Sequence, residues 1–286
     1  MRLSDEVRFE MARGRAIAAK RFRGGTIPTI ALHGWLDNAN SFDALAEAMP
    51  ELDLLAMDFA GHGFSDPRPR DVGYWGWLDV QDVIAVADQL GWQRFVVVAH
   101  SMGAEYSTQL VGIYPERVGA QICIDGYVEA TPVDTVLDAV RDNLDACLAP
   151  SDGTLRGYAS LDAMAERLVE AKGIAFPAAR TLVERGHRIT EAGYVWSTES
   201  RIRRTHTQRQ PDDVVVALAR RTVAPTLLIA ATDGEDWFQR SLGLVRTVLP
   251  AFEEVTIEGP HHLHMSSALP AVVAEIRRFL AAHGVS

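Results

Sequence analysis

The stretch that decides the fold is residues 96–104, Val-Val-Val-Ala-His-Ser-Met-Gly-Ala, in which an apolar run leads directly into Ser101. A short apolar run of this kind is typical of a strand that is buried on both faces. Small residues stand two positions before the serine, at Ala99, and two positions after it, at Gly103. A small-x-Ser-x-Gly pattern between a strand and a helix predicts a sharp turn that presents Ser101 as a nucleophile at the carboxyl edge of a sheet.

Strands and helices alternate on both sides of this turn. The opening residues, 7–22, predict a hairpin of two strands, and glycine-bounded apolar runs predict six further strands. Such alternation is typical of an α/β fold with a mostly parallel, twisted sheet of eight strands and helices on both faces. After the hairpin, the expected strands are 27–32, 52–57, 95–98, 118–124, 225–230 and 252–257, and the expected helices are 42–49, 78–90, one running from Ser101 to Tyr114, and 269–282.

The alternation lapses in the middle of the chain, where the sequence becomes polar, helix-like and broken. We interpret residues 127–221 as a helical cap inserted into the core and placed over one edge of the sheet. The core is then made of two parts, residues 1–126 and residues 222–286.

Composition excludes several classes of function. Of the 286 residues, 48% are hydrophobic and 23% charged, as in an ordinary soluble globular protein. The formal net charge of −10 argues against nucleic acid or an anionic membrane surface as the main partner, because phosphate binding needs clustered positive charge. No apolar run is long enough for a membrane span, and the first residues lack the apolar segment of a signal peptide, so a cytoplasmic location is expected. The two cysteines have no metal-binding spacing, and we expect neither a metal nor a cofactor.

A serine nucleophile needs a base, which should lie late in the chain because the order of the partners in this arrangement is serine, acid, histidine. Residues 257–265, Ile-Glu-Gly-Pro-His-His-Leu-His-Met, offer three histidines. His261 follows the last predicted strand most closely and is the expected base. His262 and His264 are expected to be neighbours that shape the site, and either one is the alternative base.

The acid has two possible positions. It commonly follows the seventh predicted strand in a turn where its place falls here on Gly234, with Asp233 and Asp236 displaced on either side. The other position is the end of the sixth strand, which Asp125 occupies. A carboxylate at the end of a buried strand is costly without a donor partner, and His261 would be that partner. We therefore expect Asp125 to be the acid, with Asp233 or Asp236 as the alternatives.

An oxyanion hole needs two backbone N–H groups aimed at the developing negative charge. The residue after the nucleophile, Met102, is expected to supply one. The other is expected from Trp35, in the loop that follows the third predicted strand.

Four motifs together resemble those of the α/β-hydrolase superfamily: His33-Gly34-Trp35, the glycine-rich run from Asp58 to Ser65, the turn at Ser101, and His261 two residues after Gly259. Residues 32–42, 56–63, 182–186 and 261–266 are closer still to its serine hydrolase-like branch. That branch is similar in carrying an aspartate where Asp125 stands and none at the position of Gly234. The resemblance covers nearly the whole chain and implies a fold and a catalytic apparatus, but no named reaction.

These features predict a serine hydrolase without a cofactor that cleaves an ester or thioester of a small acyl substrate through an acyl-enzyme. The expected roles are Ser101 as nucleophile, His261 as base, Asp125 as acid, and Trp35 and Met102 as oxyanion donors. The same groups could instead transfer the acyl group to an alcohol or peroxide, or open a lactone. A further alternative is a binding protein that uses a hydrolase-like pocket without catalysis.

Overall fold

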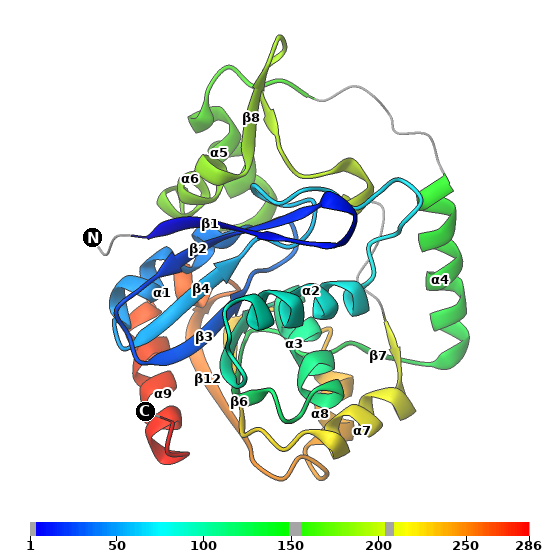
Figure 1. Cartoon of the computed structure of the whole chain (residues 1–286), viewed down its shortest axis with the longest axis vertical. Coiled ribbons are helices and arrows are strands. Elements are labelled where there is room, and N and C mark those ends of the chain that lie inside the picture. The colour runs from blue at the N-terminus through cyan, green and yellow to red at the C-terminus, as the bar shows by residue number, and fades with distance from the viewer. Residues whose placement is uncertain (1–3, 149–155, 204–208, 286) are drawn as a thin grey trace.

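A twisted sheet of eight strands forms the centre of the protein, seen in a computed structural model that describes residues 4–148, 156–203 and 209–285 (Figure 1). The strand order is β1-β2-β4-β3-β5-β6-β11-β12. The hairpin strand β2 pairs antiparallel with β1 and β4, and the other neighbours pair parallel, so the mostly parallel sheet expected from the sequence is confirmed. The strands are β1 (Asp5–Glu10), β2 (Ala16–Phe22), β3 (Ile27–Leu32), β4 (Leu52–Met57), β5 (Phe95–His100), β6 (Val118–Ile124), β11 (Thr226–Asp233) and β12 (Phe252–Pro260).

Helices cover both faces of the sheet and bury two separate hydrophobic layers. Leu45 and Phe279 belong to the layer on one face, and Val83, Leu110 and Val215 belong to the layer on the other. Within the described residues, no helix combines the length and the apolar character needed to cross a bilayer. The first face carries α1 (Asp43–Ala48) and α9 (Leu269–Ala282), and the second carries α2 (Gly76–Gln89), α3 (Met102–Ile113), α7 (Asp212–Arg221) and α8 (Gln239–Val245).

The parallel strands bring distant parts of the sequence to one edge of the sheet. The residues that follow β3, β5, β6 and β12 include Trp35, Ser101, Asp125 and His261, in that order. Because the carboxyl ends of parallel strands lie at the same edge, these four residues share a single region of the molecule.

The inserted segment has a hydrophobic core of its own, built around Met164, Leu168 and Leu182. It is not purely helical as expected, because an antiparallel hairpin follows its helices. The helix α7 packs against α3 and α8 of the core and also against β7 and β10 of the insertion, so the boundary at residue 221 stays a prediction. The elements of the insertion before α7 are β7 (Ala130–Thr131), α4 (Val133–Leu148), α5 (Leu161–Lys172), α6 (Phe176–Arg185), β8 (His187–Thr190), β9 (Gly193–Trp196), a short 3-10 helix (Ser200–Arg203) and β10 (Gln210–Pro211).

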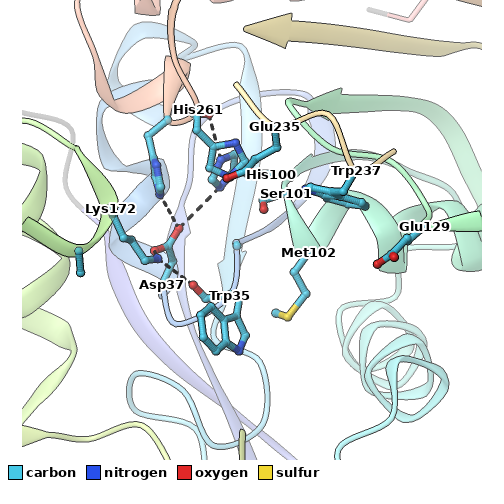
Figure 2. Close-up of a pocket in the computed structure, with 13 residues that line it drawn as sticks. Trp35, Asp37, His100, Ser101, Met102, Glu129, Lys172, Glu235, Trp237 and His261 are labelled. Carbon is cyan, nitrogen blue, oxygen red and sulfur yellow. Dashed lines mark hydrogen bonds and ion pairs between the residues drawn. The ribbon is translucent and has the colours of Figure 1, made fainter. Parts of the chain in front are cut away.

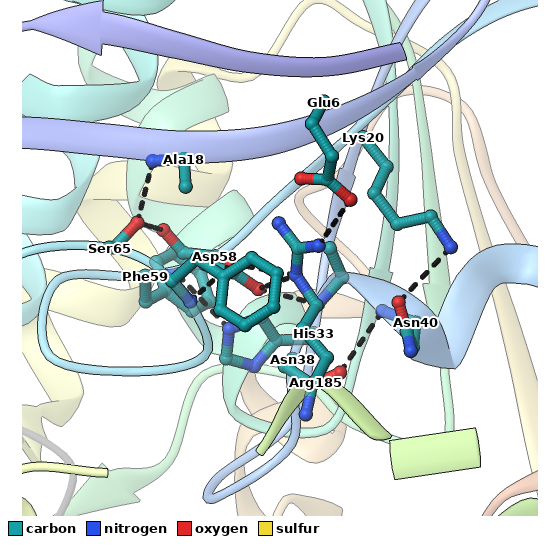
Figure 3. A network of polar contacts seen from close by, with 12 residues as sticks. Glu6, Ala18, Lys20, His33, Asn38, Asn40, Asp58, Phe59, Ser65 and Arg185 are labelled. Carbon is teal, nitrogen blue, oxygen red and sulfur yellow. Dashed lines mark hydrogen bonds and ion pairs between the residues drawn. The ribbon is translucent and has the colours of Figure 1, made fainter. Parts of the chain in front are cut away.

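A buried ion pair joins the cap to the core (Figure 3). Arg185, at the end of α6, donates from Nε to both oxygens of Asp58 at 3.1 and 2.8 Å. Asp58 also accepts hydrogen bonds from the backbone N–H groups of Ala39 and Phe64, and Arg185 reaches Glu6 at 2.6 Å. The first residue of the glycine-rich run, Asp58, therefore joins the core to the cap.

Replacing Arg185 with methionine should lower the free energy of unfolding by about 3–5 kcal/mol, because the carboxylate of Asp58 is fully buried and would lose its cation. Denaturant titration measures the effect. The matched control is Arg180→Met on the same helix, whose ion pairs with Asp162 and Glu184 are partly exposed and contribute about 0–1 kcal/mol. Equal losses in the two variants would contradict an anchoring role for Arg185.

Candidate active site

Ser101 lies in a tight turn between β5 and α3, with φ of 52° and ψ of −120°. Such a backbone is costly for a serine and persists only where its surroundings hold it. The Ser101 N–H donates to the carbonyl of Ile124 at 3.1 Å. A Cβ on Gly103 would lie 2.3 Å from the carbonyl oxygen of Leu32, and one on Gly126 would lie 2.7 Å from the Cα of Ser101. The expected requirement for a small residue at position 103 thus has a steric cause.

Asp125 immediately follows β6, and its side chain is almost completely buried. One carboxylate oxygen, Oδ1, accepts a hydrogen bond from the backbone N–H of Ala231 at 2.8 Å. The other, Oδ2, accepts from the backbone N–H of Glu235 at 3.1 Å and lies 2.5 Å from Nδ1 of His261. These contacts hold the carboxylate in one orientation and direct it at the histidine expected to be the base.

Position 234 has no room for a side chain, because the carboxylate of Asp125 fills the space beside Gly234. A Cβ built on Gly234 would lie 2.3 Å from Oδ2 and 2.4 Å from Oδ1 of Asp125. Asp233 and Asp236, the alternative acids, are both exposed to solvent. A side chain at position 234 and the side chain of Asp125, which follows β6, would therefore occupy the same space. In this structure the carboxylate of Asp125 fills it.

The three late histidines have distinct surroundings. His261 lines the pocket and contacts the carboxylate of Asp125 through Nδ1. His262 turns to another carboxylate, that of Asp37, with its Nε2 at 3.1 Å from Oδ2. His264 is fully buried against the ring of Phe42, and this burial lowers its pKa to about 3. The roles expected for His262 and His264, as neighbours that shape the site, stay predictions.

His100, directly before the nucleophile, lies among these histidines. Its ring centroid is 4.6 Å from those of His261, His262 and His264, and its Nε2 donates to the carbonyl of His261 at 3.2 Å. Nitrogens of His100, His261 and His262 fall within 4.8 Å of one another, and among the described residues one nitrogen of each ring is engaged by a hydrogen bond while the other is not. His100 therefore packs against the rings of all three late histidines.

The two expected oxyanion donors line the same pocket as Ser101. In the described part of the chain, no hydrogen-bond acceptor lies on the backbone N–H of Trp35 or on that of Met102. Met102 is the first residue of α3, so its N–H also carries the positive end of the helix dipole. Their role as oxyanion donors stays a prediction.

A cavity of about 500 Å³ opens in front of Ser101 (Figure 2). Trp35 and Trp237 give it aromatic surface, and the cap contributes Lys172 from the end of α5. Several of the lining residues had no role predicted from the sequence: Asp37, Glu129, Ala171, Lys172, Glu235 and Trp237.

A signal for one of them was present in the sequence. Asp37 stands two residues after Trp35 in a loop expected to carry an oxyanion donor, and a carboxylate there needs a partner. Its partner Lys172 lies 135 positions further along the chain, in a cap that cannot be docked from sequence alone.

Comparisons with known proteins agree with this architecture. A family model described as the alpha/beta hydrolase fold matches residues 28–167. A serine hydrolase-like protein of Danio rerio is 28% identical over 265 residues, which cover 88% of this chain and 81% of that protein. The crystal structure of a hypothetical protein from Pseudomonas aeruginosa PAO1 is 35% identical with a TM-score of 0.87, covering 99% of this chain and all of the other. A thioesterase domain from the curacin biosynthetic pathway shares the fold at 20% identity, with a TM-score of 0.80 over 96% of this chain and 99% of its own.

The sheet order, the strand–turn–helix at Ser101 and these matches define an α/β hydrolase. The chain belongs to the α/β-hydrolase superfamily, and serine hydrolase-like proteins are among the relatives that it resembles.

Proposed function

We propose that this protein is a serine hydrolase that cleaves a carboxylic ester or thioester of a small molecule through an acyl-enzyme. The observation that carries the proposal is the 2.5 Å contact between Nδ1 of His261 and Oδ2 of Asp125, beside a serine held in a strained turn. Structural neighbours described as esterases and a thioesterase favour the same reaction class.

In the first step, Oγ of Ser101 attacks the substrate carbonyl carbon while Nε2 of His261 takes the serine proton. Asp125 keeps the Nδ1 proton of His261 in place, so that Nε2 is the basic nitrogen, and stabilises the imidazolium that forms. The N–H groups of Trp35 and Met102 hold the negative oxygen.

His261 then returns its proton to the leaving alcohol or thiol, and the tetrahedral intermediate collapses to an acyl-enzyme on Ser101. A water molecule, deprotonated by His261, attacks the acyl carbon in the second step. The carboxylic acid leaves and the serine recovers its proton. Each step needs only side chains and backbone groups of this chain.

A fluorophosphonate probe should label the wild-type protein with one equivalent per chain, and peptide mapping by mass spectrometry should place the label on Ser101. Such a probe reacts rapidly only with a serine that has a working base and oxyanion hole. Heat-denatured protein is the control and should not be labelled. A folded protein that binds acyl compounds without reacting with the probe would contradict the proposal and favour a binding protein.

Assays with competing acceptors separate hydrolysis from acyl transfer. With a p-nitrophenyl or thioester substrate, we expect free acid as the main product when millimolar alcohol or hydrogen peroxide is present. An acyl ester or peracid as the main product would show that the natural reaction transfers the acyl group.

A further inference from the structure

One buried carboxylate, that of Asp37, links four parts of the chain around the candidate site (Figure 2). Its Oδ1 lies 2.5 Å from Nζ of Lys172 in the cap helix α5. Its Oδ2 lies 3.1 Å from Nε2 of His262, after the base, and 3.6 Å from Nδ1 of His100, before the nucleophile. The Asp37 side chain has no exposed surface, so its charge depends on these partners.

Asp37 also closes the turn that carries the oxyanion donor. Its backbone N–H donates to the carbonyl of Gly34 at 3.1 Å, and the same carbonyl lies 2.7 Å from Nδ1 of His33. That carbonyl shares a planar peptide group with the N–H of Trp35. Fixing the carbonyl on one side therefore fixes the direction of the Trp35 N–H on the other.

Lys172 fastens this turn from the cap. Its ammonium group donates to the carbonyl oxygen of Trp35 at 2.8 Å as well as to Asp37. The intervening residue, Leu36, has a φ of 59°, which is an uncommon conformation for leucine and needs support from its surroundings. The lysine thus holds both ends of the Trp35–Asp37 segment.

The pair also controls the charge next to the base. Five titratable side chains face His262: Asp37, Lys172, His100, His261 and His264. Burial lowers the pKa of His262; the carboxylate of Asp37 opposes this effect, and the cation of Lys172 adds to it. Although burial acts in the other direction, the cation of Lys172 and the hydrogen bond from His262 hold the pKa of Asp37 well below its usual range. With the Lys172–Asp37 pair intact, His262 stays neutral beside His261.

We propose that Lys172 and Asp37 form a positioning pair through which the docked cap fixes the oxyanion donor Trp35 and holds His262 in place beside the base. This inference rests on the proposed function. In this proposal, neither Lys172 nor Asp37 touches the reacting atoms. Both act indirectly, by holding the turn that carries Trp35 and by contacting His262.

The test is Lys172→Met, assayed on the same ester substrate as the wild type. We expect kcat to fall by roughly 10- to 100-fold, somewhat less than the loss on deleting an oxyanion donor, with KM changed by less than about threefold. The loss should deepen as the pH falls, because without Lys172 the pKa of His262 rises, and a protonated His262 opposes the imidazolium that forms on His261. A merely structural role would not produce this pH dependence.

The matched control is Arg167→Met on the same helix, which removes a cation from an exposed pair with Glu170. It should keep the wild-type kcat and pH profile. If Lys172→Met kept them too, or if Arg167→Met lost as much, the proposal would be wrong. Wild-type labelling of Ser101 reports on the proposed function separately, so the two failures can be told apart.

A double variant, Asp37→Asn with Lys172→Met, leaves no unpaired buried charge and is measurable even if the single variant fails to fold. Its kcat should remain low, because the Trp35 carbonyl no longer accepts a hydrogen bond from the side chain at position 172. Its extra loss at low pH should disappear, since no carboxylate remains to raise the pKa of His262. A wild-type kcat in this variant would overturn the positioning role.

Discussion

Replacing Ser101 with alanine should lower kcat/KM for ester hydrolysis by about 10⁴- to 10⁶-fold, the range found when a catalytic serine is removed. The residual rate would come from substrate binding and the N–H groups of Trp35 and Met102. The fold should be retained, because the turn is held by backbone hydrogen bonds, such as that from the Ser101 N–H to the carbonyl of Ile124, and not by the serine side chain. Steady-state kinetics with a p-nitrophenyl ester and a thermal unfolding curve measure both quantities.

Ser267→Ala is the control for this prediction. Ser267 is an exposed serine shortly after the expected base, and its hydroxyl lies outside the pocket lining. This variant should keep the wild-type rate. Loss of activity in Ser267→Ala, or retention of it in Ser101→Ala, would contradict the assignment of Ser101 as the nucleophile.

Replacing Asp125 with asparagine should lower kcat by about 10⁴-fold, because an amide favours the wrong tautomer of His261 and cannot stabilise the imidazolium. Asparagine tolerates the positive φ of 42° at this position, and its oxygen can still accept from the N–H of Ala231. The variant should therefore fold. Circular dichroism and kcat measured between pH 6 and 9 check the result.

The side chains at positions 125 and 234 compete for the same space, so a pair of variants can test where the acid must lie. Gly234→Asp alone should inactivate the protein, since its Cβ would lie 2.3 Å from the carboxylate of Asp125. Adding Asp125→Gly removes that conflict and should restore part of the activity through a carboxylate at the other position. If Asp233→Asn or Asp236→Asn lost as much activity as Asp125→Asn, the acid would be one of those exposed residues.

The fold could be predicted because its signals are local. Each central strand is a short apolar run bounded by glycine or a polar residue, and the nucleophile turn adds a steric pattern of its own at Ala99 and Gly103. His261 could be predicted as the base for the same reason, because it lies directly after the last strand in the sequence. The hairpin β8–β9 in the cap escaped prediction because its strands of four residues each carry too little alternation.

The choice of acid and the network at Asp37 depend on contacts between distant segments. Asp125 is distinguished from Asp233 and Asp236 by its burial and by hydrogen bonds to Ala231 and Glu235, which the sequence does not encode as a pattern. The partner of Asp37 comes from a cap helix whose docking is set by packing and by the Arg185–Asp58 pair. Physical reasoning about buried charge predicts that such partners must exist, but not where in the chain they lie.

The dependence of Asp37 on Lys172 limits how freely caps can be exchanged between relatives of this fold. A chimaera that carried a foreign cap on this core would leave a carboxylate in an apolar interior unless the new cap brought a cation to the same place. Grafts meant to alter substrate preference should therefore be screened for that cation, or be paired with an uncharged residue at position 37. In this protein, the cap helix that carries Lys172 and the core loop that carries Asp37 are therefore expected to be inherited together.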